Sequence, residues 1–369
     1  MSGGIGLAVI GCGTIGRIRA VLARETVAVE WLGLCDIDEE TARRLGEDTK
    51  ADFVTTDFRD LLAQPEVTAV IVATAENEHV DPILASTDLG VPMFIEKPLA
   101  TDPVESARVL QAITDSGVDA VIGYTQRFRR RFQTVKQRLR DGQIGEVTSV
   151  VTRAFMNRMV PLATLRKTDQ RSVLTPMVVS GTHSLDMSMW LMEGKEPVEV
   201  YARSIDTALR DLGTKDATFG VFTMDDGTLF SMNINWALPT VWPGAVYGLE
   251  IGIVGTKGVI DIEDTHRDVI LATEIPQPAG YTSKGFAPDS ARYVDFIGSY
   301  PPGDVSDGLL WGPMREETLT WYNRLTTGID TPHATAADGH RNLILTMAMD
   351  HSARTGKPVA LPIDPEDLR

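Results

Sequence analysis

The chain is poor in cysteine. Cys12 and Cys35 are its two cysteines among 369 residues, so we expect no disulfide framework, and reduced thiols favour a cytoplasmic protein. Neither cysteine has a histidine or another cysteine at the spacing of a metal site. We therefore expect no bound metal.

Long apolar segments and an excess of positive charge are also missing. No run of about 18 apolar residues is present that could cross a membrane, and the first four residues lack the basic stretch of a secretory signal. The formal net charge is −16, which disfavours nucleic acids and anionic membranes as partners. These absences leave a small-molecule substrate as the expected partner.

The first third of the chain has apolar segments that predict strands alternating with helices. The segments lie at residues 5–10, 31–35, 51–55, 69–73, 91–95 and 120–123. This alternation is typical of a doubly wound parallel sheet, the α/β Rossmann architecture. Because 369 residues exceed one ordinary core, we predict an N-terminal domain over residues 1–124 and a second domain over residues 125–369.

A glycine-rich turn follows the first predicted strand and precedes a helical pattern. Its sequence is Gly11-Cys12-Gly13-Thr14-Ile15-Gly16, in which glycines permit a tight turn and close approach of the backbone to a pyrophosphate. Asp36 ends the second strand, where a carboxylate hydrogen-bonds a ribose diol and repels a 2′-phosphate. The pattern predicts NAD as the cofactor.

The fifth predicted strand runs directly into the charged pair Glu96-Lys97 and stops at Pro98. In an open α/β sheet the carboxyl edge is where ligands bind, and the proline prevents the strand from continuing past the charge. Lys97 is therefore the first catalytic candidate. The alternative is a lysine that only pairs with Glu96, although adjacent strand residues point to opposite faces.

Polar residues also follow the fourth predicted strand. Thr74, Asn77 and His79 lie where side chains can line the cofactor channel. For His79 a purely local role at the start of a helix is an equal alternative.

After Gly123 the pattern changes to runs of period two, which predict a mostly antiparallel sheet. One helix interrupts these runs from Thr175-Pro176 to about Met192, and His183 and Asp186 share one stripe of it. Helices are predicted again at residues 287–297, 313–326 and 336–353. His183 is a second catalytic candidate, with a satisfied core histidine as the alternative.

Together these motifs resemble the glucose-fructose oxidoreductase, inositol dehydrogenase and rhizopine-catabolism family, Gfo/Idh/MocA. The matching residues are the turn from Gly11 to Gly16, Asp36, Thr74, Asn77, His79, Glu96-Lys97-Pro98, Gly123-Tyr124, Arg127-Phe128, Gly181-Thr182-His183, Asp186 and Gly255-Thr256-Lys257-Gly258. The resemblance implies a Rossmann domain, a C-terminal α/β domain whose open sheet forms a homodimer or homotetramer, and NAD-dependent hydride transfer at a hydroxyl-bearing carbon.

The resemblance also implies site residues. The family's catalytic set is the lysine of Glu-Lys-Pro with an aspartate and a histidine four residues apart, of which Lys97 and His183 match. Val179 stands where the aspartate is expected. Two alternatives stay open: His183 relies on Asp186, or Lys97 is the main proton carrier. The implied cofactor contacts are Gly11, Gly13, Thr14, Ile15, Gly16, Asp36, Thr74, Asn77, His79, Glu96 and Lys97.

Basic residues concentrate between Arg127 and Arg171, where twelve lysines and arginines face three acidic residues. The basic residues up to Arg140 lie on a predicted helix. Those from Arg153 onward lie on the strand and loop that lead toward His183. Guanidinium groups there would hold a carboxylate, sulfonate or phosphate. The substrate candidates are Arg127, Arg153, Asn157, Arg171 and Asp186.

We therefore predict an NAD-dependent dehydrogenase of a sugar, a cyclitol or an acidic derivative. Two alternatives are retained. One is an NAD-dependent glycosidase that uses transient oxidation and elimination without net NADH, as some members of the family do. The other is an NAD-binding sensor without catalysis.

Overall fold

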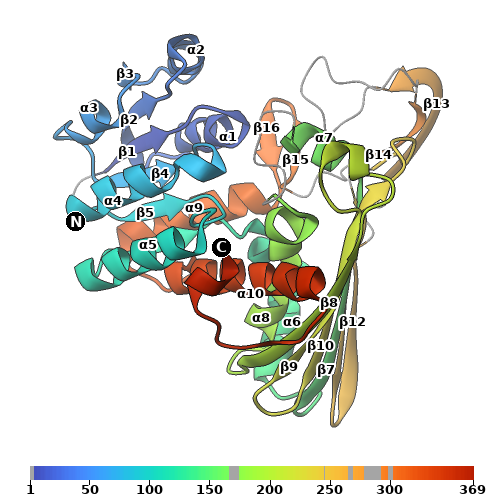
Figure 1. Ribbon diagram of the computed structural model, residues 1–369. Coiled ribbons are helices and arrows are strands. Elements are labelled where there is room, and N and C mark those ends of the chain that lie inside the picture. Colours follow the sequence, from blue (N-terminus) through green and yellow to red (C-terminus); the bar gives the residue numbers. More distant parts are fainter. Residues whose placement is uncertain (1–3, 166–173, 245, 265–268, 278–291, 298–301) are drawn as a thin grey trace. The chain divides into compact units, whose positions relative to one another are not determined.

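The computed structural model describes residues 4–165, 174–244, 246–264, 269–277, 292–297 and 302–369 (Figure 1). Its contacts divide the chain into two compact units. Unit 1 comprises the residues up to Phe128, Val305–Leu343 and Arg369; unit 2 comprises Arg129–Asp304 and Ile344–Leu368. The predicted boundary between two domains after residue 124 stays a prediction.

Unit 1 is built on a seven-stranded sheet in the order β17-β6-β5-β4-β1-β2-β3. The first six strands in the chain pair in parallel, and β17 joins β6 antiparallel at the edge. The strands are β1 (Ile5–Ile10), β2 (Val29–Cys35), β3 (Phe53–Thr55), β4 (Ala69–Val72), β5 (Met93–Ile95), β6 (Ala120–Ile122) and β17 (Ala334–Thr335). The predicted doubly wound sheet is confirmed.

The helices of unit 1 begin and end at recognisable capping residues. Asp38, Asp57 and Asp102 accept hydrogen bonds at the helix starts, and Gly117 and Gly328 end helices in the left-handed conformation. The helices are α1 (Thr14–Ala23), α2 (Glu39–Thr49), α3 (Phe58–Leu62), α4 (Val80–Asp88), α5 (Pro103–Ser116) and α9 (Pro313–Thr327), with short helices at Glu76–Glu78 and Thr125–Phe128. α9 returns late in the chain and packs Trp321 and Tyr322 into the core of this sheet.

Unit 2 is built on a second seven-stranded sheet in the order β12-β11-β7-β10-β9-β8-β18. β7 and β10 run parallel, while the other neighbouring strands are antiparallel. The strands are β7 (Val147–Asn157), β8 (Pro197–Ile205), β9 (Ala217–Met224), β10 (Leu229–Leu238), β11 (Val246–Gly255), β12 (Gly258–Asp264) and β18 (Val359–Ala360). The predicted, mostly antiparallel second sheet is also confirmed.

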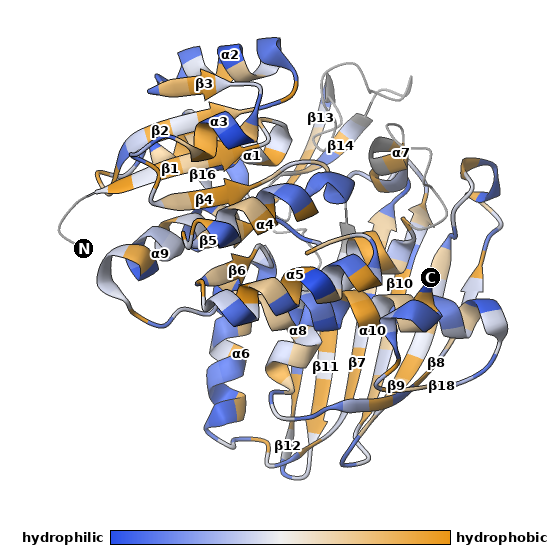
Figure 2. Cartoon of the chain, turned by 60° about the vertical axis from the view of Figure 1, so that its left-hand side comes forward, coloured by the Kyte–Doolittle hydropathy of each residue, from blue (hydrophilic) through white to orange (hydrophobic). Residues whose placement is uncertain are grey.

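One face of this second sheet is packed and the other is open. On the packed face, Val150, Phe222 and Ile251 form a core with residues of α6 (Arg130–Arg140), α8 (Thr182–Leu191) and α10 (Ala336–Thr355). Figure 2 shows the hydrophobic strands beside the mostly hydrophilic α6. The open face exposes Val151, Tyr201, Phe219, Val221, Leu229, Val254 and Val259.

A helix predicted at residues 287–297 is wrong. Residues 292–297 form β14 (Arg292–Ile297), which pairs antiparallel with β13 (Val269–Gln277), and the rest of the predicted helix lies outside the described residues. The β-branched and aromatic residues in Tyr-Val-Asp-Phe-Ile favour a strand. Further elements are α7 (Met159–Leu165), β15 (Asp304–Ser306), β16 (Leu309–Trp311), a π-helical turn at Met177–Gly181 and short helices at Arg210–Leu212 and Pro365–Leu368.

Candidate active site

The glycine turn at the carboxyl end of β1 is shaped by close backbone contacts. Gly11 has φ 96°, and a Cβ there would lie 2.4 Å from the carbonyl oxygen of Ala73. A Cβ on Gly16 would lie 1.8 Å from the carbonyl oxygen of Gly11. At Gly13, which precedes the first residue of α1, a side chain would point into open space, and no side chain caps the helix. The uncapped helix start therefore fits a pyrophosphate.

Asp36 is held next to this turn by two backbone N–H groups. Its Oδ2 accepts a hydrogen bond from Cys12 N at 2.7 Å, and its Oδ1 accepts one from Asp38 N at 2.9 Å. The side chain is half-buried at the end of β2. The carboxylate is thus fixed where it can accept hydrogen bonds from ribose hydroxyls.

The turn after β4 is organised by its own polar residues. Thr74 Oγ1 donates to the carbonyl oxygen of Glu78 at 3.2 Å, and Asn77 Nδ2 donates to the Glu78 carboxylate at 2.6 Å. His79 is buried, with Nδ1 2.7 Å from the carbonyl oxygen of Pro98. Burial lowers the pKa of His79, and Nδ1 is the donor to Pro98 because a carbonyl oxygen can only accept. His79 is thus joined to the segment after β5, and both its role at the start of the helix and its contact with cofactor stay predictions.

Lys97 lies between two residues that the fold holds in place. Glu96 N donates to the carbonyl oxygen of Val72 at 2.9 Å, which extends the pairing of β5 with β4 by one residue. On the other side, Pro98 accepts the hydrogen bond from His79, and its peptide bond with Lys97 is cis. Lys97 itself is half-buried at the carboxyl edge of the sheet.

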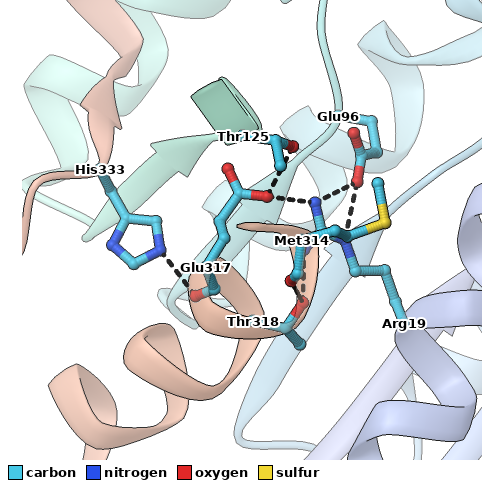
Figure 3. A network of polar contacts seen from close by, with 7 residues as sticks. All are labelled: Arg19, Glu96, Thr125, Met314, Glu317, Thr318 and His333. Atoms are coloured by element: carbon cyan, nitrogen blue, oxygen red, sulfur yellow. Dashed lines mark hydrogen bonds and ion pairs between the residues drawn. The ribbon is translucent and has the colours of Figure 1, made fainter. Parts of the chain in front are cut away.

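A buried polar network behind Glu96 was not predicted (Figure 3). Arg19 of α1 is fully buried, and its Nε donates to Glu96 Oε1 at 2.8 Å. Its Nη2 donates to Glu317 Oε2 at 2.7 Å, and its Nη1 donates to Thr318 Oγ1. Thr125 Oγ1 also donates to Glu317 Oε2, at 2.9 Å. The network joins α1, the end of β5 and α9.

The two acids of this network share a single arginine. Burial and the charge of Glu96 together raise the pKa of Glu317 from its ordinary 4.5 to about 7, against the opposing effect of Arg19. His333 Nε2 lies 3.1 Å from the carbonyl oxygen of Glu317, and burial lowers the pKa of His333 to about 3. His333 is therefore neutral, and Glu317 changes protonation near neutral pH.

His183 belongs to unit 2, on a helix that begins irregularly. The π-helical turn Met177–Gly181 precedes α8, of which His183 is the second residue. Neither Val178 nor Val179 offers a carboxylate one turn before it. Asp186 lies on the same helix and is fully buried, whereas His183 is half-buried.

The start of this helix is tied to α10. Thr175 Oγ1 accepts a hydrogen bond from Val178 N at 3.2 Å and donates one to the carboxylate of Asp350. Burial raises the pKa of Asp350 to about 7. Ser180 Oγ accepts a hydrogen bond from Trp236 Nε1 at 2.8 Å. These contacts hold the backbone before His183 against the sheet.

The candidate substrate residues are spread through the chain. Arg127 of unit 1 is buried and forms an ion pair with Asp338 at 3.3 Å. Arg153 lies on the open face of the second sheet, in an ion pair with Glu250. Its neighbours Thr152 and Ala154 are fully buried on the opposite, helix-covered face. Arg153 therefore points away from α8.

Asn157 supports a loop rather than facing an open space. Its Nδ2 donates to the carbonyl oxygen of Trp242 at 2.9 Å, and its Oδ1 accepts from Met159 N at 3.0 Å. Arg171 lies outside the described residues.

The candidate residues of unit 1 lie together. The glycine turn, Asp36, the turn after β4 and Lys97 are all at the carboxyl edge of one sheet.

Comparison with known proteins yields two sequence profiles of one family. The profile described as "Oxidoreductase family, NAD-binding Rossmann fold" matches residues 5–124, and "GFO/IDH/MocA C-terminal domain" matches residues 132–261. The cofactor of the N-terminal unit is NAD, and the structure provides the uncapped glycine turn and the fixed Asp36 that suit it.

Several named relatives act on inositols. An inositol 2-dehydrogenase of Gluconacetobacter diazotrophicus is 32% identical over 197 residues, which are 52% of this chain and 55% of that protein. A myo-inositol 2-dehydrogenase of Thermotoga maritima is 24% identical over 96% of this chain and 98% of its own. The scyllo-inositol dehydrogenase of Lactobacillus casei, solved with NAD(H) and scyllo-inositol, has a TM-score of 0.74, 18% identity and 97% and 99% coverage of the two chains.

Proposed function

The chain belongs to the Gfo/Idh/MocA oxidoreductase family, and from this premise we propose that it oxidises a ring hydroxyl of an inositol or a related polyol with NAD. The observation that carries the proposal is Lys97, fixed at the carboxyl edge of the cofactor sheet between Glu96 and Pro98. The named inositol dehydrogenases among its relatives support the class of substrate. They do not support the glycosidase or sensor alternatives.

In this proposal the side chains of Lys97 and His183 handle the hydroxyl proton. The glycine turn and Asp36 would hold NAD, which would supply the hydride acceptor for the carbinol carbon. The amine nitrogen of Lys97 accepts the hydrogen bond of the substrate hydroxyl and takes its proton, so the alcohol loses a hydride and a proton and becomes a carbonyl. The imidazole of His183 orients or relays that proton, without the aspartate one turn earlier that the family resemblance implies.

A direct assay tests this function. Purified protein is mixed with NAD and, in separate reactions, with myo-inositol, scyllo-inositol and a panel of sugars and sugar acids, and NADH is followed by its absorbance. We expect NADH formation with at least one cyclitol. Release of free sugar from glycosides without net NADH would instead support elimination, and binding of NAD without turnover of any substrate would support a sensor.

A neutral polyol is favoured over an anionic derivative. Arg127 and Arg153 form ion pairs with carboxylates of the chain itself, which reduces what they can offer to an anion. Arg171 stays a candidate for anion binding. If Arg153→Ala and Arg171→Ala lower turnover of a sugar acid but not of the matching neutral sugar, the anionic derivative is the better substrate class.

Cofactor preference depends on Asp36. We expect Asp36→Ser to raise the Kd for NAD by about 10- to 100-fold, since hydrogen bonds to a charged acceptor contribute about 1.5–3 kcal/mol each, and to narrow the preference for NAD over NADP. Fluorescence titration with NADH and NADPH measures both. Asp52→Asn is the control. Asp52 directly precedes β3, at the opposite edge of the sheet from the cofactor turn, and its carboxylate accepts a hydrogen bond from Leu32 N. Unchanged NAD affinity in Asp36→Ser would contradict this role.

The open face of the second sheet is the proposed contact between subunits of a homodimer or homotetramer. Across this face Val221 pairs with Tyr201 on one side and Ser231 on the other. A broad, exposed apolar sheet surface is typical of a protein interface. A second copy of the chain on this face would remove its exposed apolar side chains from water.

A single charge on that face tests the assembly. We expect Val221→Lys to convert the oligomer to a monomer, because the lysine would be buried without a partner at the interface. Light scattering after gel filtration measures the mass. Val27→Lys is the matched control, since Val27 is 98% exposed in unit 1. If Val221→Lys keeps the wild-type mass, the interface lies elsewhere.

The cytoplasm is the proposed location. Cys12 and Cys35 are both free thiols, as expected in a reducing compartment. Among the described residues, no helix combines the length and the apolar character needed to cross a bilayer.

A further inference from the structure

Arg19 connects three parts of unit 1 that are far apart in the sequence. It lies on α1, which begins at the glycine turn, and it binds Glu96 beside Lys97 and Glu317 on α9. Nη1 is also 3.4 Å from the carbonyl oxygen of Met314, while Thr318 Oγ1 donates to that same carbonyl at 2.7 Å. The guanidinium carbon lies 4.1 Å from the ring centre of Phe94, the second residue of β5. These contacts are made by β5, by Glu96 directly before Lys97, and by α9.

The carboxylate of Glu96 is enclosed as well as paired. A Cβ on Gly123 would lie 2.8 Å from Glu96 Oε2, so the absence of a side chain at Gly123 makes room for the carboxylate. The backbone of Glu96 is fixed to Val72, and Pro98 is fixed to His79. Lys97 is the residue between these two anchors, so its Cα and the direction of its side chain depend on both.

We propose that Arg19 is a positioning residue for Lys97, which it fixes to the helix that begins at the glycine turn by binding Glu96 and Glu317 together. This inference rests on the proposed function only for the consequence in turnover. The positioning itself is a property of unit 1. A displacement of a catalytic group by about 1 Å costs about 100-fold in rate, so such an anchor has a measurable effect.

The geometry requires an arginine rather than any cation. The planar guanidinium directs Nε and Nη2 toward Glu96, Nη2 toward Glu317 and Nη1 toward Thr318, while its face lies over Phe94. A lysine carries the same charge in a single ammonium group and cannot span this set of acceptors. Arg19→Lys therefore keeps the charge and removes the bridge.

The test compares Arg19→Lys with Arg24→Lys, a control that directly follows the last residue of the same helix. Arg24 donates to the carbonyl oxygens of Thr49 and Lys50 and pairs with Asp52, away from the carboxyl edge. Three quantities are measured for each full-length protein: kcat with myo-inositol, the Kd for NAD, and the ¹³C resonance of Lys97 after reductive methylation with labelled formaldehyde. Lys97→Arg identifies that resonance by its disappearance.

We expect Arg19→Lys to lower kcat by about 10- to 100-fold, to leave the Kd for NAD within about twofold, and to shift or broaden the Lys97 resonance. Arg24→Lys should leave all three unchanged. A wild-type Lys97 resonance and a wild-type kcat in Arg19→Lys would overturn the proposal. If the wild-type protein forms no NADH from myo-inositol, the proposed substrate fails, and the Lys97 resonance alone decides the positioning.

A milder variant covers the case in which Arg19→Lys does not fold. Thr318→Val removes one acceptor of Arg19 with little change in shape. We expect it to change the Lys97 resonance in the same direction and to lower kcat less than Arg19→Lys does. A resonance identical to that of the wild-type protein in Thr318→Val, together with full kcat, would count against an anchor at Arg19.

Discussion

Replacement of Lys97 by alanine is expected to lower kcat by about 10²- to 10⁴-fold, the contribution of a positioned proton carrier, while the Kd for NAD stays within about twofold. The backbone of the turn is held by Glu96 and Pro98, neither of which depends on the Lys97 side chain. Lys97→Ala should therefore lose turnover but keep its affinity for NAD. Steady-state NADH formation and a fluorescence titration of NADH measure the two.

Two further variants sharpen this result. Lys97→Arg keeps a positive charge but does not release its proton near neutral pH, so it should be nearly as slow as Lys97→Ala if Lys97 carries the proton. Lys357→Ala is the control, because Lys357 is exposed in unit 2. Turnover of Lys97→Ala at the wild-type rate would remove Lys97 from the mechanism. A larger loss in His183→Ala than in Lys97→Ala would make His183 the main carrier.

Loss of the cation behind Lys97 should have the largest effect on stability. We expect Arg19→Met to reduce the free energy of unfolding by about 3–5 kcal/mol, the usual effect of leaving a buried charge without its partner. Glu96 and Glu317 would then face each other's charge with no arginine between them. Chemical denaturation followed by tryptophan fluorescence reports the change, since Trp321 packs against Phe94 in this region.

The loss should also depend on pH. The pKa of Glu317 rises from 4.5 in the unfolded chain to about 7 in the folded protein, so its protonated form stabilises the fold below about pH 4.5 and that stabilisation is lost as the pH rises through about 7. At pH 5.5 Glu317 is mostly neutral and needs no cation. Arg19→Met should therefore destabilise the protein more at pH 8 than at pH 5.5.

A second substitution separates charge from packing. We expect Glu317→Gln to flatten the pH dependence between about pH 5 and pH 8, and Arg19→Met combined with Glu317→Gln to recover part of the stability lost at pH 8. An equal loss at both pH values in Arg19→Met would show that packing around Arg19, rather than the charge of Glu317, dominates.

Most of the first sheet could be predicted because its signals are local. The glycine turn, Asp36 and the strand that ends at Glu96 each depend on a few consecutive residues, and β1 has the predicted bounds. Parallel strands with helical connections then determine that these turns meet at one edge. The strand β14 was misassigned because it is short and because its pairing with β13 is not local.

The network around Arg19 could not be predicted for a different reason. Arg19 lies three residues after Gly16 on the buried stripe of α1, which is a signal that its charge needs a partner. The sequence offers many acids, and the partner is 298 residues away. The face of the sheet on which Arg153 lies could not be predicted either. The residues of β7 point alternately to its two faces, and both faces contain apolar residues, so the sequence does not identify the packed one.

The position of Glu317 has a consequence for synthesis of the protein. A ribosome adds about 5–20 residues per second, so Arg19 emerges roughly 15–60 s before the helix that supplies its second acid. Until then the nascent Rossmann sheet lacks Trp321 and Tyr322 from its core and holds an arginine with half of its partners. We expect a fragment that stops before residue 305 to be degraded or retained by chaperones. We also expect unit 1 to complete its folding only after α9 has been synthesised.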